Sequence, residues 1–318
     1  MDKSSTQKPL CAGVDIGKNW LDYGLPDKTV ARSPHTEAGL AELVAFCKKH
    51  RVERVGIEST GSYGDDVAAS LRAAGLVVIV WQPQKIRAYA QFRGLKAKTD
   101  KIDAVLIAIC TQNMDEDKVR DAPDSRLADL AEYLTQIDQI TEDIARNKTR
   151  REHVSNKEIL TQMREDLKRL MVNKRTAIKV LVEKVRAHDD LARKLDLLSS
   201  IQGLGIPTAL VLVIRMPELG TITREEAASL LGVAPFDHES GQYKGQRRTG
   251  AGRARARTSL FAAVQAAARQ WNPQLIALYK RLIAKGKHHN TAIIACTRKM
   301  IIFANTVLAK NRPWEVRT

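Results

Sequence analysis

The feature that most constrains the fold is a long stretch in the middle of the chain, residues 125–198, which lacks glycine and proline. Apolar residues recur there at steps of three and four, as at Leu127, Leu130 and Leu134, which is the spacing of an apolar helix face. We therefore expect long helices. They fit either a coiled-coil hairpin that dimerises or an intramolecular helical bundle, and the spacing alone does not separate the two.

The part of the chain before this helical stretch alternates between strand and helix patterns. We expect strands over 11–17, 21–25, around 30, over 54–58 and over 76–81. We expect helices over 36–50, from the turn at 59–63 to about Ala74, and from Pro83 onward. The run over 76–81 is continuous and β-branched, which predicts a strand that is buried on both faces. The resulting order is three strands, helix, strand, helix, strand, helix.

Four carboxylates fall at special places in this pattern. Asp15 lies inside the first strand and Glu58 ends the fourth, while Asp100 and Asp103 are one turn apart if their segment is helical. Like charges at that spacing repel, and a divalent cation held by carboxylates and phosphate oxygens would remove the penalty. Lysines at 96, 98 and 101 would then meet the phosphates. The alternative is a solvated helix start with Thr99 or Asp100 as its N-cap.

The order of elements resembles the ribonuclease-H-like α/β fold in its Holliday-junction-resolvase arrangement. That resemblance implies that Asp15, Glu58, Asp100 and Asp103 converge on two Mg²⁺ ions. Two metals about 4 Å apart activate a nucleophile and stabilise the leaving oxygen of a phosphodiester, which requires clustered carboxylates.

The charge of the chain points to a polyanionic partner. The net charge is +16, and residues 199–318 carry 18 Lys and Arg against 6 Asp and Glu. This asymmetry favours a module that grips a nucleic-acid backbone. The four cysteines are scattered among apolar neighbours and predict reduced core residues. Residues 1–9 lack the apolar core of a signal peptide, and no apolar run approaches the roughly 18 residues of a membrane span. We expect a soluble protein of the prokaryotic cytosol or nucleoid, with no membrane partner.

The basic last third contains two glycine-rich segments. Gly203 and Gly205 lie in a turn that resembles a helix-hairpin-helix, whose backbone N–H groups approach phosphates, although a plain interhelical turn fits equally well. Residues 234–257 have little apolar material and predict a long functional loop. The expected nucleic-acid contacts of this third are Gly203, Gly205, Lys244, Arg247, Arg248, Arg253, Arg255 and Arg257. The rest of the third predicts helices.

Several motifs together resemble one family. The GVDIG strand around Asp15, the segment 58–63, the Lys98–Asp103 segment, Gln202–Gly205 and the 231–241 segment are similar to those of the DEDD transposases of the insertion-sequence 110 family. The similarity spans nearly the whole chain in order and spacing. Gln82-Pro83 departs from the Asn-Pro expected there, at a point away from the carboxylates.

The resemblance implies an RNA-guided DNA recombinase that excises and inserts a mobile element. It implies Mg²⁺ at the four carboxylates and a serine nucleophile at Ser240. It further implies donor and target duplex DNA, a structured noncoding guide RNA, and a dimer that assembles into a tetramer. We expect three regions: a catalytic domain over 1–122, a coiled-coil region over 123–198 and a helical transposase domain over 199–318.

Chemistry agrees with a serine nucleophile, because a phosphoserine ester conserves the bond for rejoining. Lys244, Arg247 and Arg248 could stabilise charge on the phosphorane. The plainer interpretation of Ser240 is a turn serine before glycine. Three other functions stay open: an RNA-independent DNA invertase, a metal-dependent junction-resolving nuclease, and a basic architectural protein whose carboxylates only cap helices.

Overall fold

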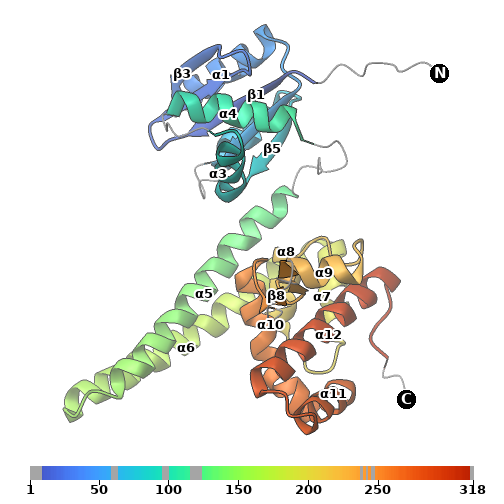
Figure 1. The fold of residues 1–318 in the computed structure, drawn as a ribbon. Helices are drawn as coiled ribbons and strands as arrows, with labels where there is room; N and C mark the ends of the chain where they lie inside the picture. The colour runs from blue at the N-terminus through green and yellow to red at the C-terminus, as the bar shows by residue number, and fades with distance from the viewer. Residues whose placement is uncertain are drawn as a thin grey trace. The chain divides into compact units, whose positions relative to one another are not determined.

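The computed structural model divides into two compact units, Met1–Pro123 and Asp124–Thr318, which we describe separately (Figure 1). The structure describes residues 9–58, 64–94, 100–114, 124–236, 239–240, 243–244 and 248–315, with only the backbone at 100–102, 236, 239–240, 243–244 and 248. The three predicted region boundaries stay predictions.

The first unit is built on a five-stranded mixed sheet with the order β3-β2-β1-β4-β5. The strands are β1 (Cys11–Ile16), β2 (Trp20–Gly24), β3 (Val30–Pro34), β4 (Arg54–Glu58) and β5 (Val77–Trp81). The first three are antiparallel neighbours, whereas β4 runs parallel to both β1 and β5. The predicted sequence of strands and helices is confirmed.

Helices cover both faces of this sheet. They are α1 (Glu37–Lys49), α2 (Asp65–Ala73), α3 (Pro83–Phe92) and α4 (Asp100–Gln112). One face carries Val14 and Ile57, which share a buried core with Leu43 of α1 and Leu71 of α2. The opposite face carries α4, which lies along β1 in Figure 1. Every second residue of β1 and β4 is apolar and faces this core, as in Ala12, Val14 and Ile16, whereas the residues between them, such as Gly13 and Asp15, face α4.

Glycines in neighbouring strands let α4 lie directly on the sheet. A Cβ on Gly13 of β1 would lie 2.1 Å from the Ala104 carbonyl oxygen, and one on Gly56 of β4 would lie 2.0 Å from the Thr111 hydroxyl. Gly13 and Gly56 are register partners, and Gly24 of β2 is the partner of Gly13 on the other side. This row of glycines therefore fixes how closely α4 approaches β1 and β4.

The expectation that β5 is buried on both faces is wrong. Val77 and Val80 have 42% and 49% of their surfaces exposed, because β5 is the edge strand of the sheet. A continuous β-branched run is typical of a central strand, but Val78 and Ile79 alone supply the buried positions here.

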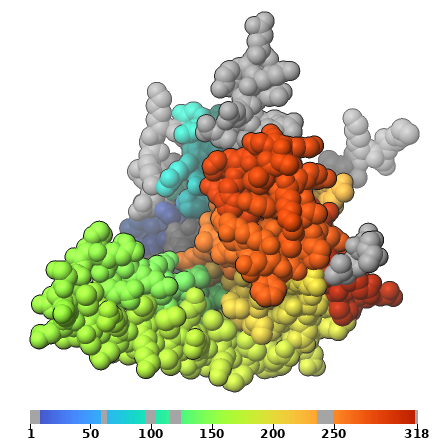
Figure 2. All heavy atoms as spheres, turned by 90° about the horizontal axis from the view of Figure 1, so that it is seen from below, coloured from blue at the N-terminus to red at the C-terminus, as the bar shows by residue number. Residues whose placement is uncertain are grey.

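The second unit begins with an antiparallel pair of long helices, α5 (Ser125–Arg151) and α6 (Lys157–Arg186). Asp124 and Asn156 cap their N-termini through side-chain oxygens. The base of this helical hairpin is buried, with Leu130 and Leu134 of α5 and Leu181 of α6 in the core. Beyond the base the hairpin forms an arm, seen in green in Figure 2. The predicted long helices are confirmed, and supercoiling is not.

The remainder of the second unit is mostly helical. Its helices are α7 (Asp189–Ser199), α8 (Ile206–Arg215), α9 (Arg224–Leu231), α10 (Ala254–Ala266), the π-helical turn η3 (Ala267–Trp271), α11 (Pro273–Ala284) and α12 (His289–Lys310). Only α12 among the described helices is long and apolar enough to cross a membrane, and 56% of its apolar window is buried inside this unit. Cys296, Met300 and Ile301 are buried in the core of this unit, so α12 is a core helix.

The segment expected to be a long loop contains short strands instead. β6 (Pro235–Phe236) pairs with β9 (Arg248–Thr249), and β7 (Glu239–Ser240) pairs with β8 (Tyr243–Lys244), each antiparallel. The described part of 235–249 therefore consists of two short two-stranded sheets, which together we call the ribbon. Glycine and arginine content predicted a loop because two-residue strands leave no alternating apolar pattern.

Candidate active site

Two of the four predicted carboxylates lie side by side on the sheet. Val14 of β1 is the register partner of Ile57 of β4, so the next residue of each strand, Asp15 and Glu58, are neighbours. Adjacent strands are about 4.8 Å apart. Side chains two positions apart share a face, so Asp15 lies on the same face as Gly13 and Glu58 on the same face as Gly56. That face is the one that carries α4.

The other two predicted carboxylates belong to α4 itself. Asp103 directly precedes Ala104, whose carbonyl oxygen is the group that blocks a Cβ at Gly13. Asp103 is half-buried, as are Asp15 and Glu58. Asp100 is the first residue of α4, and its side chain lies outside the described residues. The sheet and α4 thus bring three carboxylates to one face of the first unit.

The arrangement does not amount to a complete cation cage in the residues whose side chains are described. Among them, no group of three or more His, Cys, Asp or Glu side chains is close enough to hold a metal ion. Asp15, Glu58 and Asp103 each have an interaction partner. Carboxylate oxygens are nevertheless the hard ligands that Mg²⁺ takes in proteins, and the pair on adjacent strands is a suitable start.

Sequence analysis missed a fifth carboxylate in the same row. Asp22 of β2 is the register partner of Asp15, and Arg32 of β3 is the register partner of Asp22. Asp22 is only 4% exposed, and Arg32 binds it through two hydrogen bonds, Nε to Oδ1 at 2.9 Å and Nη2 to Oδ2 at 2.7 Å. The available signal was an Asp inside an otherwise apolar strand, the same signal that identified Asp15.

Ser240 lies in the ribbon of the second unit. It is the last residue of β7 and is paired with Tyr243 of β8. Only its backbone is described, as for Lys244 and Arg248. Lys96, Lys98 and Arg247 lie outside the described residues, and only the backbone of Lys101 lies within them.

Two predicted nucleic-acid contacts, Arg253 and Arg257, are engaged within the protein at the start of α10. Arg253 donates to the carboxylate of Glu218, with Nη1 2.6 Å from Oε2, and to the carbonyl of Arg215 at 2.7 Å. Arg257 donates to the carbonyls of Leu231 and Ala251. These arginines therefore join the start of α10 to the ends of α8 and α9.

A third arginine of this group lies more openly. The Arg255 side chain is 57% exposed and lies 3.4 Å from Asp138 of α5. Asp138 is also paired with Arg215 at 2.8 Å, in a much less exposed contact. Arg255 is thus the most accessible of the three described arginines.

The predicted glycine turn connects α7 to α8. Gly203 has a φ of +88°, and a Cβ there would lie 2.4 Å from the Cβ of Ala267. Gly205 is the N-cap of α8 and is exposed. Close packing against η3 alone accounts for Gly203, whereas phosphate binding at this turn stays a prediction.

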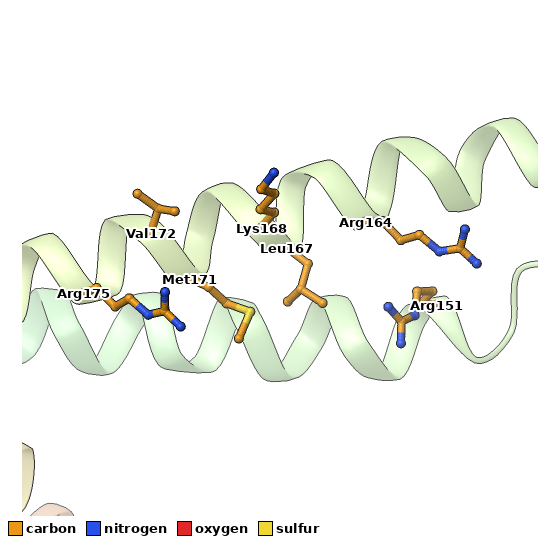
Figure 3. A pocket seen from close by; sticks show the side chains of 7 residues that line it. All are labelled: Arg151, Arg164, Leu167, Lys168, Met171, Val172 and Arg175. Carbon is orange, nitrogen blue, oxygen red and sulfur yellow. The ribbon is translucent and has the colours of Figure 1, made fainter. Parts of the chain in front are cut away.

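The helical hairpin carries a basic groove of about 290 Å³ along α6 and the end of α5 (Figure 3). Leu167 and Met171 point toward α5, and Lys168 points away from it. Four cations and no carboxylate line this groove: Arg151, Arg164, Lys168 and Arg175. A second groove on the hairpin has a similar volume of about 280 Å³, but two acids line it and are paired with two of its arginines, as Arg146–Asp143 and Arg169–Asp166.

Comparisons with known proteins show which family the chain belongs to. Residues 12–156 match a family model described as a transposase with the DEDD signature, and residues 195–280 match one described as "Transposase IS116/IS110/IS902 family". Pilin gene-inverting proteins of Moraxella bovis and Moraxella lacunata are each 25% identical over 316 residues. Each alignment covers 96% of this chain and 97% of the relative. The two matched models lie in order along most of the chain, and the chain belongs to the IS110 family of DEDD transposases, enzymes that act on DNA.

Proposed function

We propose that this chain is an RNA-guided DNA transposase that excises and inserts a mobile element. The observation that carries the proposal is the pair Asp15 and Glu58 on adjacent strands, on the face where α4 brings Asp103. Mixed-sheet order and helix placement support a ribonuclease-H-like, Holliday-junction-resolvase-like fold for the first unit.

Asp15, Glu58, Asp100 and Asp103 would hold Mg²⁺. Bound there, the metal would lower the pKa of a hydroxyl nucleophile and neutralise charge on the phosphate. The residues' own part is to present carboxylate oxygens to a cation, since anionic side chains repel the phosphodiester itself. The half-burial of Asp15 and Glu58 suits this part, because it limits their motion.

The proposed nucleophile is Ser240. Its Oγ would attack a DNA phosphorus, so that an Oγ–P bond forms while the bond from phosphorus to a deoxyribose oxygen breaks. The serine proton leaves to a base, and the departing deoxyribose oxygen takes up a proton. The number of phosphoester bonds is unchanged, which makes the step reversible by a free DNA hydroxyl.

The proposed partners are donor and target duplex DNA and a structured noncoding guide RNA. The basic groove on the hairpin supports a nucleic-acid partner, because its four cations have no acid beside them in the lining. A homodimer that assembles into a tetramer would let Ser240 of one subunit reach carboxylates of another. We place the protein in the prokaryotic cytosol or nucleoid, where its DNA substrates are.

A second candidate is a DNA invertase that needs no RNA. It is favoured by the full-length similarity to two proteins named for inverting a pilin gene. Both candidates use the same proposed chemistry. Purification from the native host, followed by sequencing of any bound RNA, separates them: one discrete RNA supports the transposase, and its absence supports the invertase.

The chemistry is tested with Asp15→Asn, Glu58→Gln and Ser240→Ala proteins. We expect the first two to lose Mg²⁺-dependent DNA cleavage by at least roughly 100-fold, because even a residue that only supports a metal ligand costs about 10–100-fold. EDTA should abolish wild-type cleavage. Ser240→Ala should bind DNA yet form no covalent adduct on a denaturing gel. Adduct formation by that variant would remove the serine assignment, and cutting without rejoining would support a junction-resolving nuclease. If the wild type and all three variants bind DNA without metal and none of them cleaves it, only an architectural role would remain.

A further inference from the structure

The feature behind this inference is the Asp22–Arg32 ion pair beside Asp15. Asp22 is 4% exposed, and a buried carboxylate is costly unless it is paired. Arg32 supplies that pairing in a two-bond geometry, yet its own side chain is 44% exposed. The pair therefore holds a guanidinium at the surface, in a fixed orientation, two strands away from Asp15.

An exposed aromatic ring completes this surface. Trp20 begins β2, two positions before Asp22, and so lies on the same face of the sheet. Half of Trp20 is exposed, and Cζ of Arg32 lies 5.9 Å from its ring centroid. A large aromatic ring left half in water adds little to folding. An aromatic ring beside a guanidinium is the combination that binds unpaired nucleotides, through base stacking and phosphate contact.

We propose that Trp20 and Arg32 form a nucleotide-binding subsite for an unpaired base of the DNA strand that is cut, with Asp22 as the positioning residue. Trp20 stacks on the base, and Arg32 contacts the neighbouring phosphate. The subsite lies on the α4 face, in the row of Asp15 and Glu58, which places this nucleotide next to the reacting phosphodiester. The assignment of the occupant rests on the proposed function.

Asp22→Asn gives a test whose sign discriminates between two explanations. Removing this negative charge should strengthen DNA binding if only net charge matters. If Asp22 positions Arg32, the same substitution should weaken binding. The matched control is Glu42→Gln on α1, an exposed residue whose helix packs on the opposite face of the sheet.

The measurement is the binding of a fluorescently labelled 12-nucleotide oligothymidylate to the full chain in EDTA, so that no cleavage occurs. We expect Trp20→Ala to weaken binding about tenfold, as for a lost stacking contact, and Trp20→Phe to retain most of the affinity. Arg32→Ala and Asp22→Asn should each weaken binding several-fold, whereas Arg72→Ala on α2, across the sheet, should not. Circular dichroism melting verifies that each variant is folded, and Trp20→Ala does not depend on the buried pair.

Unchanged binding by Trp20→Ala, or equal or tighter binding by folded Asp22→Asn, would overturn the subsite. A loss seen with oligouridylate alone would assign the surface to RNA and overturn the DNA assignment. These outcomes are separate from the cleavage test. If Asp15→Asn still cleaves DNA, the metal chemistry is wrong although the subsite stands; if Asp15→Asn is inactive and Trp20→Ala binds normally, the reverse holds.

Discussion

At the scale of single residues, glycines decide whether the carboxylates can meet. A Cβ on Gly13 would overlap the backbone of α4 at Ala104, which no side-chain rotation can relieve. Position 13 therefore controls the distance between Asp15 and Asp103. No motif analysis of carboxylates alone would have identified it.

We predict that Gly13→Ala destabilises the first unit by about 1–3 kcal/mol or more, the usual cost of overpacking. Gly250→Ala is the matched control, because nothing lies within 4 Å of its Cβ position and its φ is not positive. Denaturant unfolding followed by circular dichroism measures both. Equal stability of the two variants would contradict the close packing of α4.

The cysteines give a second prediction at this scale. Burial raises the pKa of Cys47 to about 12 and that of Cys296 to about 11, and it raises the pKa of Cys110 to about 11 despite the lowering effect of Lys85. All four cysteines are buried and free in the structure. At pH 8 the native protein should react with Ellman's reagent only as fast as it unfolds, and four thiols per chain should react in guanidinium chloride. Rapid labelling of the native chain would contradict this burial.

At the scale of elements, the hairpin groove carries charge without compensation. We predict that reversing Arg164 and Arg175 to Glu weakens binding to duplex DNA or RNA roughly tenfold, because two contacts to phosphates are lost. The control reverses Arg146 and Arg169, which have acidic partners and line the other groove. Electrophoretic mobility shifts compare the two pairs. A larger loss of binding with the control pair would contradict this prediction and place the nucleic acid in the groove lined by Arg146 and Arg169.

An ion-pair cluster ties the start of α5 to the start of α7. Hydrogen bonds from Arg126 lower the pKa of Asp124 and of Asp190 below their usual values. The distances from Arg126 Nη2 to the two carboxylates are 2.7 Å and 2.8 Å. A lowered folded-state pKa means that the pair stabilises the fold above about pH 4, the unfolded value, and that this stability is lost as the pH falls further.

We therefore predict that Asp190→Asn lowers the urea midpoint at pH 7 and that the difference from the wild type shrinks at pH 3. The exposed Glu165 of α6, changed to Gln, serves as the control, for which no difference is expected at either pH. A difference that persists at pH 3 would show that Asp190 acts through packing rather than through charge.

Elements also show where sequence reasoning succeeded. Long periodic runs identified α5 and α6, and the alternation of strands and helices identified the sheet. The two-residue strands of the ribbon were not predicted, because they are defined by cross-strand pairing and not by a local sequence pattern. The edge position of β5 escaped for a related reason, since strand order is a property of the whole sheet.

The candidate site was only partly predictable in the same way. Asp15 and Glu58 could be found as acids in apolar strands, and they are neighbours in the structure. Asp22, the register partner of Asp15, carries the same signal, but only the pairing of β2 with β1 shows that it lies in the same row. Arg253 and Arg257 were predicted to contact nucleic acid. In the structure Arg253 binds Glu218 and Arg257 binds the Leu231 carbonyl, and these partners are distant in the sequence.

At the scale of the whole molecule, the chain has two compact units with separate cores. We predict two calorimetric transitions. Gly13→Ala should lower only one of them, while a core substitution in the second unit, such as Leu198→Ala at a fully buried position, should lower only the other. A single transition shifted by both variants would mean that the units unfold as one.

The internal contacts of Arg253 and Arg257 at the start of α10 have a consequence for the salt dependence of DNA binding. Simple counting credits residues 199–318 with 18 cationic side chains. Arg253 and Arg257 are bound to Glu218 and to backbone carbonyls, so a DNA phosphate could engage them only by displacing these contacts. When DNA affinity is measured against potassium chloride concentration, the slope should therefore correspond to fewer released counterions than the residue count suggests. The number of cationic side chains available to a polyanion is smaller than the number in the sequence, because some of them bind groups within the protein.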